Sequence, residues 1–128
     1  MKYQYYGLFL LDKNDLIKDL EIPKDGKVYL DHCTLMHCSN HDEKLQEKLD
    51  WFISHNLTKV HLTLDGLGKS DKAIAFRVKK TPAIARICKN EIPHITIWAK
   101  EKPVDSNFIT SWEEIAPKEI LTYLKKYD

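Results

Sequence analysis

Apolar and polar residues follow one another along this chain with two different periods, which predict both strands and helices. Alternation every two residues, or a short apolar run, indicates a strand, whereas apolar residues at every third or fourth position indicate the buried stripe of a helix. In the first half of the chain we expect a strand over residues 5–11, a short helix over 12–22, a strand over 28–38 and an amphipathic helix over 39–56. In the second half we expect strands over 60–64, 73–78 and 93–98, a turn-rich loop over 102–107 and a terminal helix over 111–123 that is broken near Pro117.

These elements together predict the fold class. Residues 65–68 contain two glycines after the strand at 60–64 and indicate a turn, so the next strand most simply returns antiparallel to it. Residues 83–88 fit either a strand or a helical turn. Helices mixed with hairpin-linked strands predict an α+β domain with antiparallel sheet. Because no linker interrupts the pattern, we expect residues 1–128 to form a single domain.

Composition and charge narrow the class of protein. The chain has 128 residues, 43% of them hydrophobic, and its 20 Lys and Arg against 19 Asp and Glu give a formal charge of +1, which argues against wrapping of duplex nucleic acid by charge alone. It has no apolar run of the roughly 18 residues that a membrane span requires. The first residues lack the pattern of a signal peptide, and the three cysteines are odd in number. We therefore expect a cytoplasmic monomer that does not bind membranes.

One short motif occurs three times and suggests chemistry. Three of the six histidines are followed two residues later by threonine, at His32 and Thr34, at His61 and Thr63, and at His94 and Thr96. Random placement gives roughly 0.3 such pairs, so the excess is clear. On a strand, a spacing of two residues directs both side chains to the same face. Each pair therefore offers an imidazole beside a hydroxyl group.

Two such pairs across a cleft suit the hydrolysis of a phosphodiester. Near pH 7 one imidazole can take a proton from the attacking water while another, protonated, gives a proton to the departing oxygen. The threonine hydroxyls can donate hydrogen bonds to the non-bridging phosphate oxygens and hold the phosphorus between the imidazoles. This chemistry requires neither a metal ion nor a cofactor. A single His-x-Thr pair on a strand is more commonly a surface or core pair without chemistry, but the repetition favours a site.

The two outer motifs and their surroundings resemble the two-histidine (2H) phosphoesterases. The similarity lies in residues 31–35 and 93–97, and also in residues 6–10, 68–75 and 102–107, which look like the cyclic phosphodiesterase domain of tRNA ligases. The resemblance implies a bilobal, LigT-like fold with antiparallel sheets facing a central groove. It implies that His32 and His94 form the catalytic pair and that Thr34 and Thr96 bind the phosphate. It also places the loop with Lys102, Ser106 and Asn107 near the groove as substrate-binding residues.

Several alternatives stay open at this point. Spacing alone does not exclude His61, because the choice of His32 and His94 follows from the resemblance, and the acid is not distinguished from the base. Histidines and cysteines crowd into residues 32–41, but on one strand Cys33 and His37 point away from His32, so we expect no metal site. The aromatic residues Tyr5, Tyr6, Tyr29 and Trp98 fit either stacking on a nucleobase or packing in the core.

The sequence thus predicts a metal-independent phosphodiesterase that opens a 2′,3′-cyclic phosphate at an RNA end or in a small nucleotide. A second enzymatic hypothesis is cleavage of cyclic oligonucleotide signals. A hypothesis from another class is an RNA-binding module that retains the pocket without catalysis.

Overall fold

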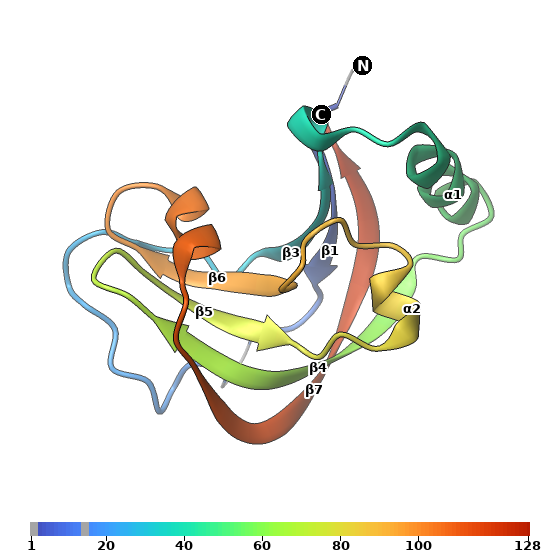
Figure 1. Cartoon of the computed structure of the whole chain (residues 1–128). Helices are drawn as coiled ribbons and strands as arrows, with labels where there is room; N and C mark the ends of the chain where they lie inside the picture. Colours follow the sequence, from blue (N-terminus) through green and yellow to red (C-terminus); the bar gives the residue numbers. More distant parts are fainter. Residues whose placement is uncertain (1–2, 14–15) are drawn as a thin grey trace.

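The computed structural model describes residues 3–13 and 16–128. Within these residues, seven strands form one antiparallel sheet in the order β2-β6-β3-β1-β7-β4-β5. Because β6 also pairs with β5, six of the seven close into a barrel (Figure 1). The strands are β1 (Tyr5–Leu10), β2 (Lys27–Val28), β3 (His32–His37), β4 (Lys59–Lys69), β5 (Ala73–Val78), β6 (His94–Ala99) and β7 (Trp112–Tyr127). The helices are α1 (Glu43–Ser54), α2 (Pro82–Ala85) and the 3₁₀ helices η1 (Cys38–Asn40) and η2 (Pro103–Phe108).

The interior of the barrel holds the alternate, apolar side chains of its strands. Those that are almost fully buried include Leu8, Leu35, Leu64, Phe76 and Ile97. α1 lies beside this core and buries Leu45 and Leu49, two residues of its predicted stripe. The predicted strands near residues 5–11, 73–78 and 93–98, the helix within 39–56 and the antiparallel return of β5 along β4 are confirmed. The chain is therefore mixed and strand-rich, with a closed antiparallel barrel.

The strand predicted over 28–38 is interrupted and then irregular. Only its first residue, Val28, belongs to β2, and Leu30 adopts a positive φ of 50° before β3 begins. A second irregularity follows where the register between β1 and β3 shifts, which buries Met36 and exposes His37. Strict alternation across the whole segment was therefore wrong, because a bulge reverses which residues face outward. Within the strand, His32 and Thr34 keep the shared face that the spacing predicted.

The terminal helix was also wrong, because this segment forms the longest strand. Within β7, Ile120, Thr122 and Leu124 are buried at alternate positions, a period of two. The strand pairs with β4 along one edge and with β1 along the other. Pro117 lies between Glu114 and Lys118, where the register with β4 shifts. Its missing N–H therefore falls at a break in the ladder, a place that tolerates proline.

Four further expectations need correction or refinement. The helix predicted over 12–22 does not form in its described part, where residues 16–20 make bends and a turn, while residues 14 and 15 lie outside the described residues. β4 continues through 65–68, and the turn comes later, where Ser70 N donates to Ala73 O at 2.8 Å. Residues 83–88 include the end of the short helix α2, and the predicted loop over 102–107 is the 3₁₀ helix η2.

No helix within the described residues is long and apolar enough to cross a lipid bilayer.

Candidate functional site

The pairing of β3 with β6 brings two of the three His-x-Thr motifs together. Cys33 of β3 is the register partner of Ile95 of β6, and both side chains are fully buried in the barrel. Because neighbouring residues of a strand point to opposite faces, the residues on either side of this pair point outward. His32 and Thr34 thus lie beside His94 and Thr96 on one face, in antiparallel order.

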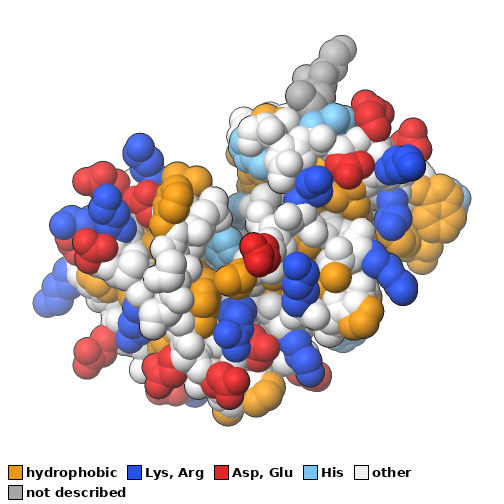
Figure 2. All heavy atoms as spheres, in the orientation of Figure 1, with side chains coloured by type: hydrophobic (Ala, Val, Ile, Leu, Met, Phe, Trp, Pro, Cys, Tyr) orange, Lys and Arg blue, Asp and Glu red, His pale blue; other side chains and the backbone are white. Residues whose placement is uncertain are grey.

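This face is one wall of a groove with a volume of about 630 Å³. The groove lies between η1 and η2, and Figure 2 shows a hollow there with histidine side chains at its floor. Its lining combines the two motifs with polar and aromatic residues: Gln4, Tyr5, Tyr29, Asp31, His32, Thr34, His37, Ser39, Asn40, Asn90, His94, Thr96, Pro103, Val104, Ser106, Asn107 and Tyr127. Among these described lining residues there is no lysine or arginine.

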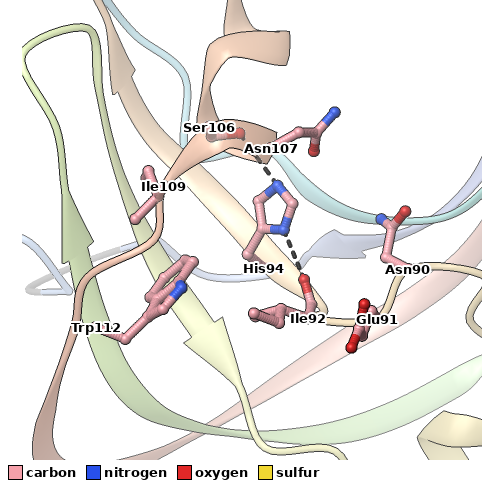
Figure 3. A pocket seen from close by; sticks show the side chains of 8 residues that line it. All are labelled: Asn90, Glu91, Ile92, His94, Ser106, Asn107, Ile109 and Trp112. Carbon is pink, nitrogen blue, oxygen red and sulfur yellow. Dashed lines mark hydrogen bonds between the residues drawn. The ribbon is translucent and has the colours of Figure 1, made fainter.

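His94 is held through both nitrogens of its ring (Figure 3). Nδ1 lies 2.8 Å from the carbonyl oxygen of Ile92, and since a carbonyl only accepts, Nδ1 carries a proton and donates it. Nε2 lies 3.1 Å from Ser106 Oγ. Nε2 is therefore the nitrogen that can exchange a proton.

The Ser106 hydroxyl suits both charge states of His94. It is buried, 2.9 Å from the carbonyl oxygen of Pro103 and 2.7 Å from Thr96 Oγ1. When Nε2 is neutral, Ser106 can donate its proton to that nitrogen and accept one from Thr96. When Nε2 is protonated, Ser106 can accept from it and donate to Pro103 O. The imidazole thus keeps a hydrogen-bond partner whether or not it is charged.

His32 lies against two aromatic rings of β1. Its ring centroid is 4.6 Å from that of Tyr5 and 5.0 Å from that of Phe9, in stacked geometry. The residue between them in β1 is Gly7, where an added Cβ would lie only 3.3 Å from His32 Cδ2. The absence of a side chain at this position therefore lets the imidazole pack onto the strand. His32 Nε2 lies 3.1 Å from Thr34 Oγ1, within its own motif.

Burial lowers the pKa of His32 below its ordinary value, because desolvation disfavours the charged imidazolium. The carboxylate of Asp31 opposes this shift, and the nearby His94 adds to it. Asp31 itself pairs with Lys13 at 2.8 Å. His32 is thus biased toward the neutral form, which accepts a proton.

A second pocket of about 340 Å³ is also lined by His94 (Figure 3). It shares Asn90, His94, Ser106 and Asn107 with the groove. Its remaining lining residues are Glu91, Ile92, Ile109 and Trp112. The His94 ring is therefore reached from two cavities.

The structure separates the predicted site residues into two groups. His32, Thr34, His94, Thr96, Ser106 and Asn107 line one groove. Lys102 is exposed at the start of η2 and does not belong to the lining of either pocket. His61 is exposed on β4 and lines neither pocket. The third motif is therefore apart from the other two.

The sequence pattern does not predict every residue that lines the groove, and it does not decide between two roles for the aromatic candidates. Asn90 lies outside any predicted motif, yet its Nδ2 donates to the carbonyl oxygen of Thr34 at 3.2 Å. His37 was placed on the opposite face and lines the groove because of the bulge in β3. Of the aromatic candidates, Tyr5 and Tyr29 line the groove, whereas Tyr6 and Trp98 are buried in the core.

Among the described residues, no three His, Cys, Asp or Glu side chains are grouped closely enough to hold a metal ion. Comparison with family models, with curated proteins and with solved structures finds no significant match to this chain.

Proposed function

We propose that this chain is a metal-independent phosphodiesterase that hydrolyses a 2′,3′-cyclic phosphate at an RNA end or in a small nucleotide. The observation that carries the proposal is the shared groove wall on which His32 and Thr34 lie beside His94 and Thr96. The proposal includes membership of the 2H phosphoesterases, with their bilobal, LigT-like arrangement. It also includes a cytoplasmic location and action as a monomer.

His32 is the proposed general base. Its burial against Tyr5 and Phe9 favours the neutral imidazole, the form that takes a proton from the attacking water. In the free enzyme its Nε2 faces the Thr34 hydroxyl. On binding, that hydroxyl would turn to a non-bridging phosphate oxygen and leave Nε2 to the water.

His94 is the proposed general acid. Its Nδ1 proton is committed to Ile92 O, so the proton that it gives to the departing ribose oxygen comes from Nε2. Ser106 can accept a hydrogen bond from this nitrogen before the transfer and donate one to it afterwards. The bond between phosphorus and the ribose oxygen breaks as the bond to the water oxygen forms, and the ring opens to a phosphomonoester.

The groove favours hydroxyl and imidazole contacts with the phosphate. Since no lysine or arginine is among its described lining residues, the positive charge near the phosphorus would come from the protonated His94. The hydroxyls of Thr34 and Thr96 would supply the remaining donors. This composition fits a single phosphate group that is held by a few directional contacts.

The decisive experiment compares three histidine variants of the full chain. Turnover of nucleoside 2′,3′-cyclic phosphates is measured with EDTA present for the wild type and for H32A, H94A and H61A. Loss of either proton transfer typically costs about 10²- to 10⁴-fold, so we expect decreases of that order in kcat for H32A and H94A. His61 belongs to the same kind of motif on a strand of the same sheet, which makes H61A the matched control with wild-type activity.

Other outcomes would favour other functions. If only cyclic oligonucleotides are cleaved, and with the same dependence on both histidines, the site stays but the substrate class changes. If no cyclic phosphate is cleaved while RNA binds equally well to the wild type, H32A and H94A, the hypothesis of an RNA-binding module replaces the enzymatic one. Turnover that requires a metal ion added after EDTA treatment would contradict the mechanism.

A further inference from the structure

The outer face of β1 and β7 carries aromatic side chains that continue away from the groove. The register between the two strands pairs the outward residues Tyr5 with Tyr127, Gly7 with Lys125, and Phe9 with Tyr123. The residues between them, such as Leu8 and Leu124, are buried in the barrel. The outer faces of antiparallel sheets usually carry polar residues, so this aromatic surface calls for an explanation.

The rings of this surface form a stack that starts at the catalytic wall. The Tyr5 ring packs on His32. Its centroid also lies 5.0 Å from that of Tyr127, and the two tyrosine rings are inclined by 13°. Phe9 similarly packs on His32 and lies 5.8 Å from Tyr123. Tyr5 and Tyr127 also line the groove. The aromatic surface and the groove are therefore continuous.

The stack ends in an exposed ring with a positive charge beside it. Tyr127 is 41% exposed. The ammonium group of Lys125 lies 5.9 Å from the Tyr127 ring centroid and 5.5 Å from that of Phe9. Exposed aromatic rings beside a lysine are the combination that binds single-stranded nucleic acid, since bases stack on the rings and the backbone phosphates meet the cation.

We propose that this outer face of β1 and β7 binds the single-stranded RNA whose terminal phosphate enters the groove. A nucleobase stacks on the rings of Tyr127 and Tyr123, and Lys125 contacts a backbone phosphate. The inference rests on the proposed function and specifies its substrate as the end of an RNA strand several nucleotides long. Each stacked base contributes roughly fivefold or more in affinity, so the strand binds better than a mononucleotide.

The test compares two substrates that end in the same group. One is cytidine 2′,3′-cyclic phosphate, and the other is a pentanucleotide RNA that ends in it. We expect kcat/KM to be at least fivefold higher for the pentanucleotide, and K125A and Y123A to reduce this ratio. K126A is the matched control, because Lys126 is the next residue of β7 and packs over the buried Tyr6 from the other face. A ratio near one, or equal effects of K125A and K126A, would overturn the inference.

A binding measurement separates this inference from the proposed function. The probe is the same pentanucleotide with an uncyclised 3′-phosphate, followed by fluorescence anisotropy at several salt concentrations. Loss of one phosphate contact should reduce the slope of log affinity against log salt by about 0.7 in K125A and leave it unchanged in K126A. If this difference appears without any cyclic phosphate turnover, the RNA surface stands and the enzymatic proposal fails. If mononucleotides are turned over and the slopes are equal, only the surface fails.

Discussion

At the scale of single residues, the environment of His32 affects both its proposed role as a base and the stability of the protein. The imidazole ring packs against Tyr5 and Phe9 of β1, and this burial lowers the pKa of His32. The folded protein then binds fewer protons than the unfolded chain when the pH lies between the folded pKa and the ordinary value of about 6.5. The free energy of unfolding therefore falls as the pH drops through about 6.5 and levels off below the folded pKa.

This gives a prediction for H32Q. Glutamine removes the titrating group, so the variant should lose less stability than the wild type between about pH 7.5 and about pH 5. Urea denaturation of both proteins at the two pH values measures the difference, in which the titration of the other groups largely cancels. An equal loss of stability in the two proteins would contradict a partly buried His32 that favours the neutral form.

Residue spacing predicted part of the site and missed the rest for a local reason. The two-residue spacing placed Thr34 with His32 and Thr96 with His94, because both motifs lie in regular strand. It misplaced His37, because the bulge between β1 and β3 adds one residue and reverses the alternation beyond it. A bulge leaves no signal in the pattern of apolar residues that precedes it.

At the scale of elements, a buried hydroxyl group forms hydrogen bonds between η2 and β6. Ser106 is 2% exposed and connects the 3₁₀ helix to His94 and to Thr96. We predict that S106A lowers kcat for cyclic phosphates by on the order of tenfold, because an imidazole misplaced by about an ångström can cost a hundredfold. S106T keeps a hydroxyl group and should restore part of the activity.

The dependence of kcat on pH distinguishes a positioning role of Ser106 from a general loss of structure in S106A. If Ser106 serves both charge states of His94, S106A changes the pH profile and S106T shifts it back toward the wild type. A loss of activity in S106A with an unchanged profile and a lowered melting temperature would indicate a structural role only.

The element that the sequence misassigned shows how context overrides local pattern. Residues 111–123 have apolar residues at spacings that fit a helix, and Pro117 suggested a break in it. In the structure, residues from Trp112 onward form β7 and pair with β4, and from Thr122 onward the strand also pairs with β1. The partner residues lie more than forty residues away in the chain, which no local window contains.

At the scale of the whole molecule, closure of the barrel creates the site. β3 and β6 come from distant parts of the chain, yet the pairing of Cys33 with Ile95 sets their motifs side by side. Antiparallel strands could be predicted from the sequence, but not their order, because order depends on contacts between segments far apart. The groove is consequently a property of the closed sheet and not of either motif alone.

The same closure predicts one cooperative unfolding transition. β6 pairs with both β3 and β5, so its release would open the barrel and expose the apolar interior that all six strands share. Trp98 is buried in β6 and reports on the barrel, whereas Trp51 is exposed on α1. W51F retains Trp98 and Trp112, which both lie on strands of the barrel, so its tryptophan fluorescence follows the barrel, while far-ultraviolet circular dichroism follows all elements. We expect the two signals to change together over one range of urea concentration, as a two-state domain requires. A circular dichroism transition that begins before the fluorescence changes would show that α1 unfolds separately from the closed sheet.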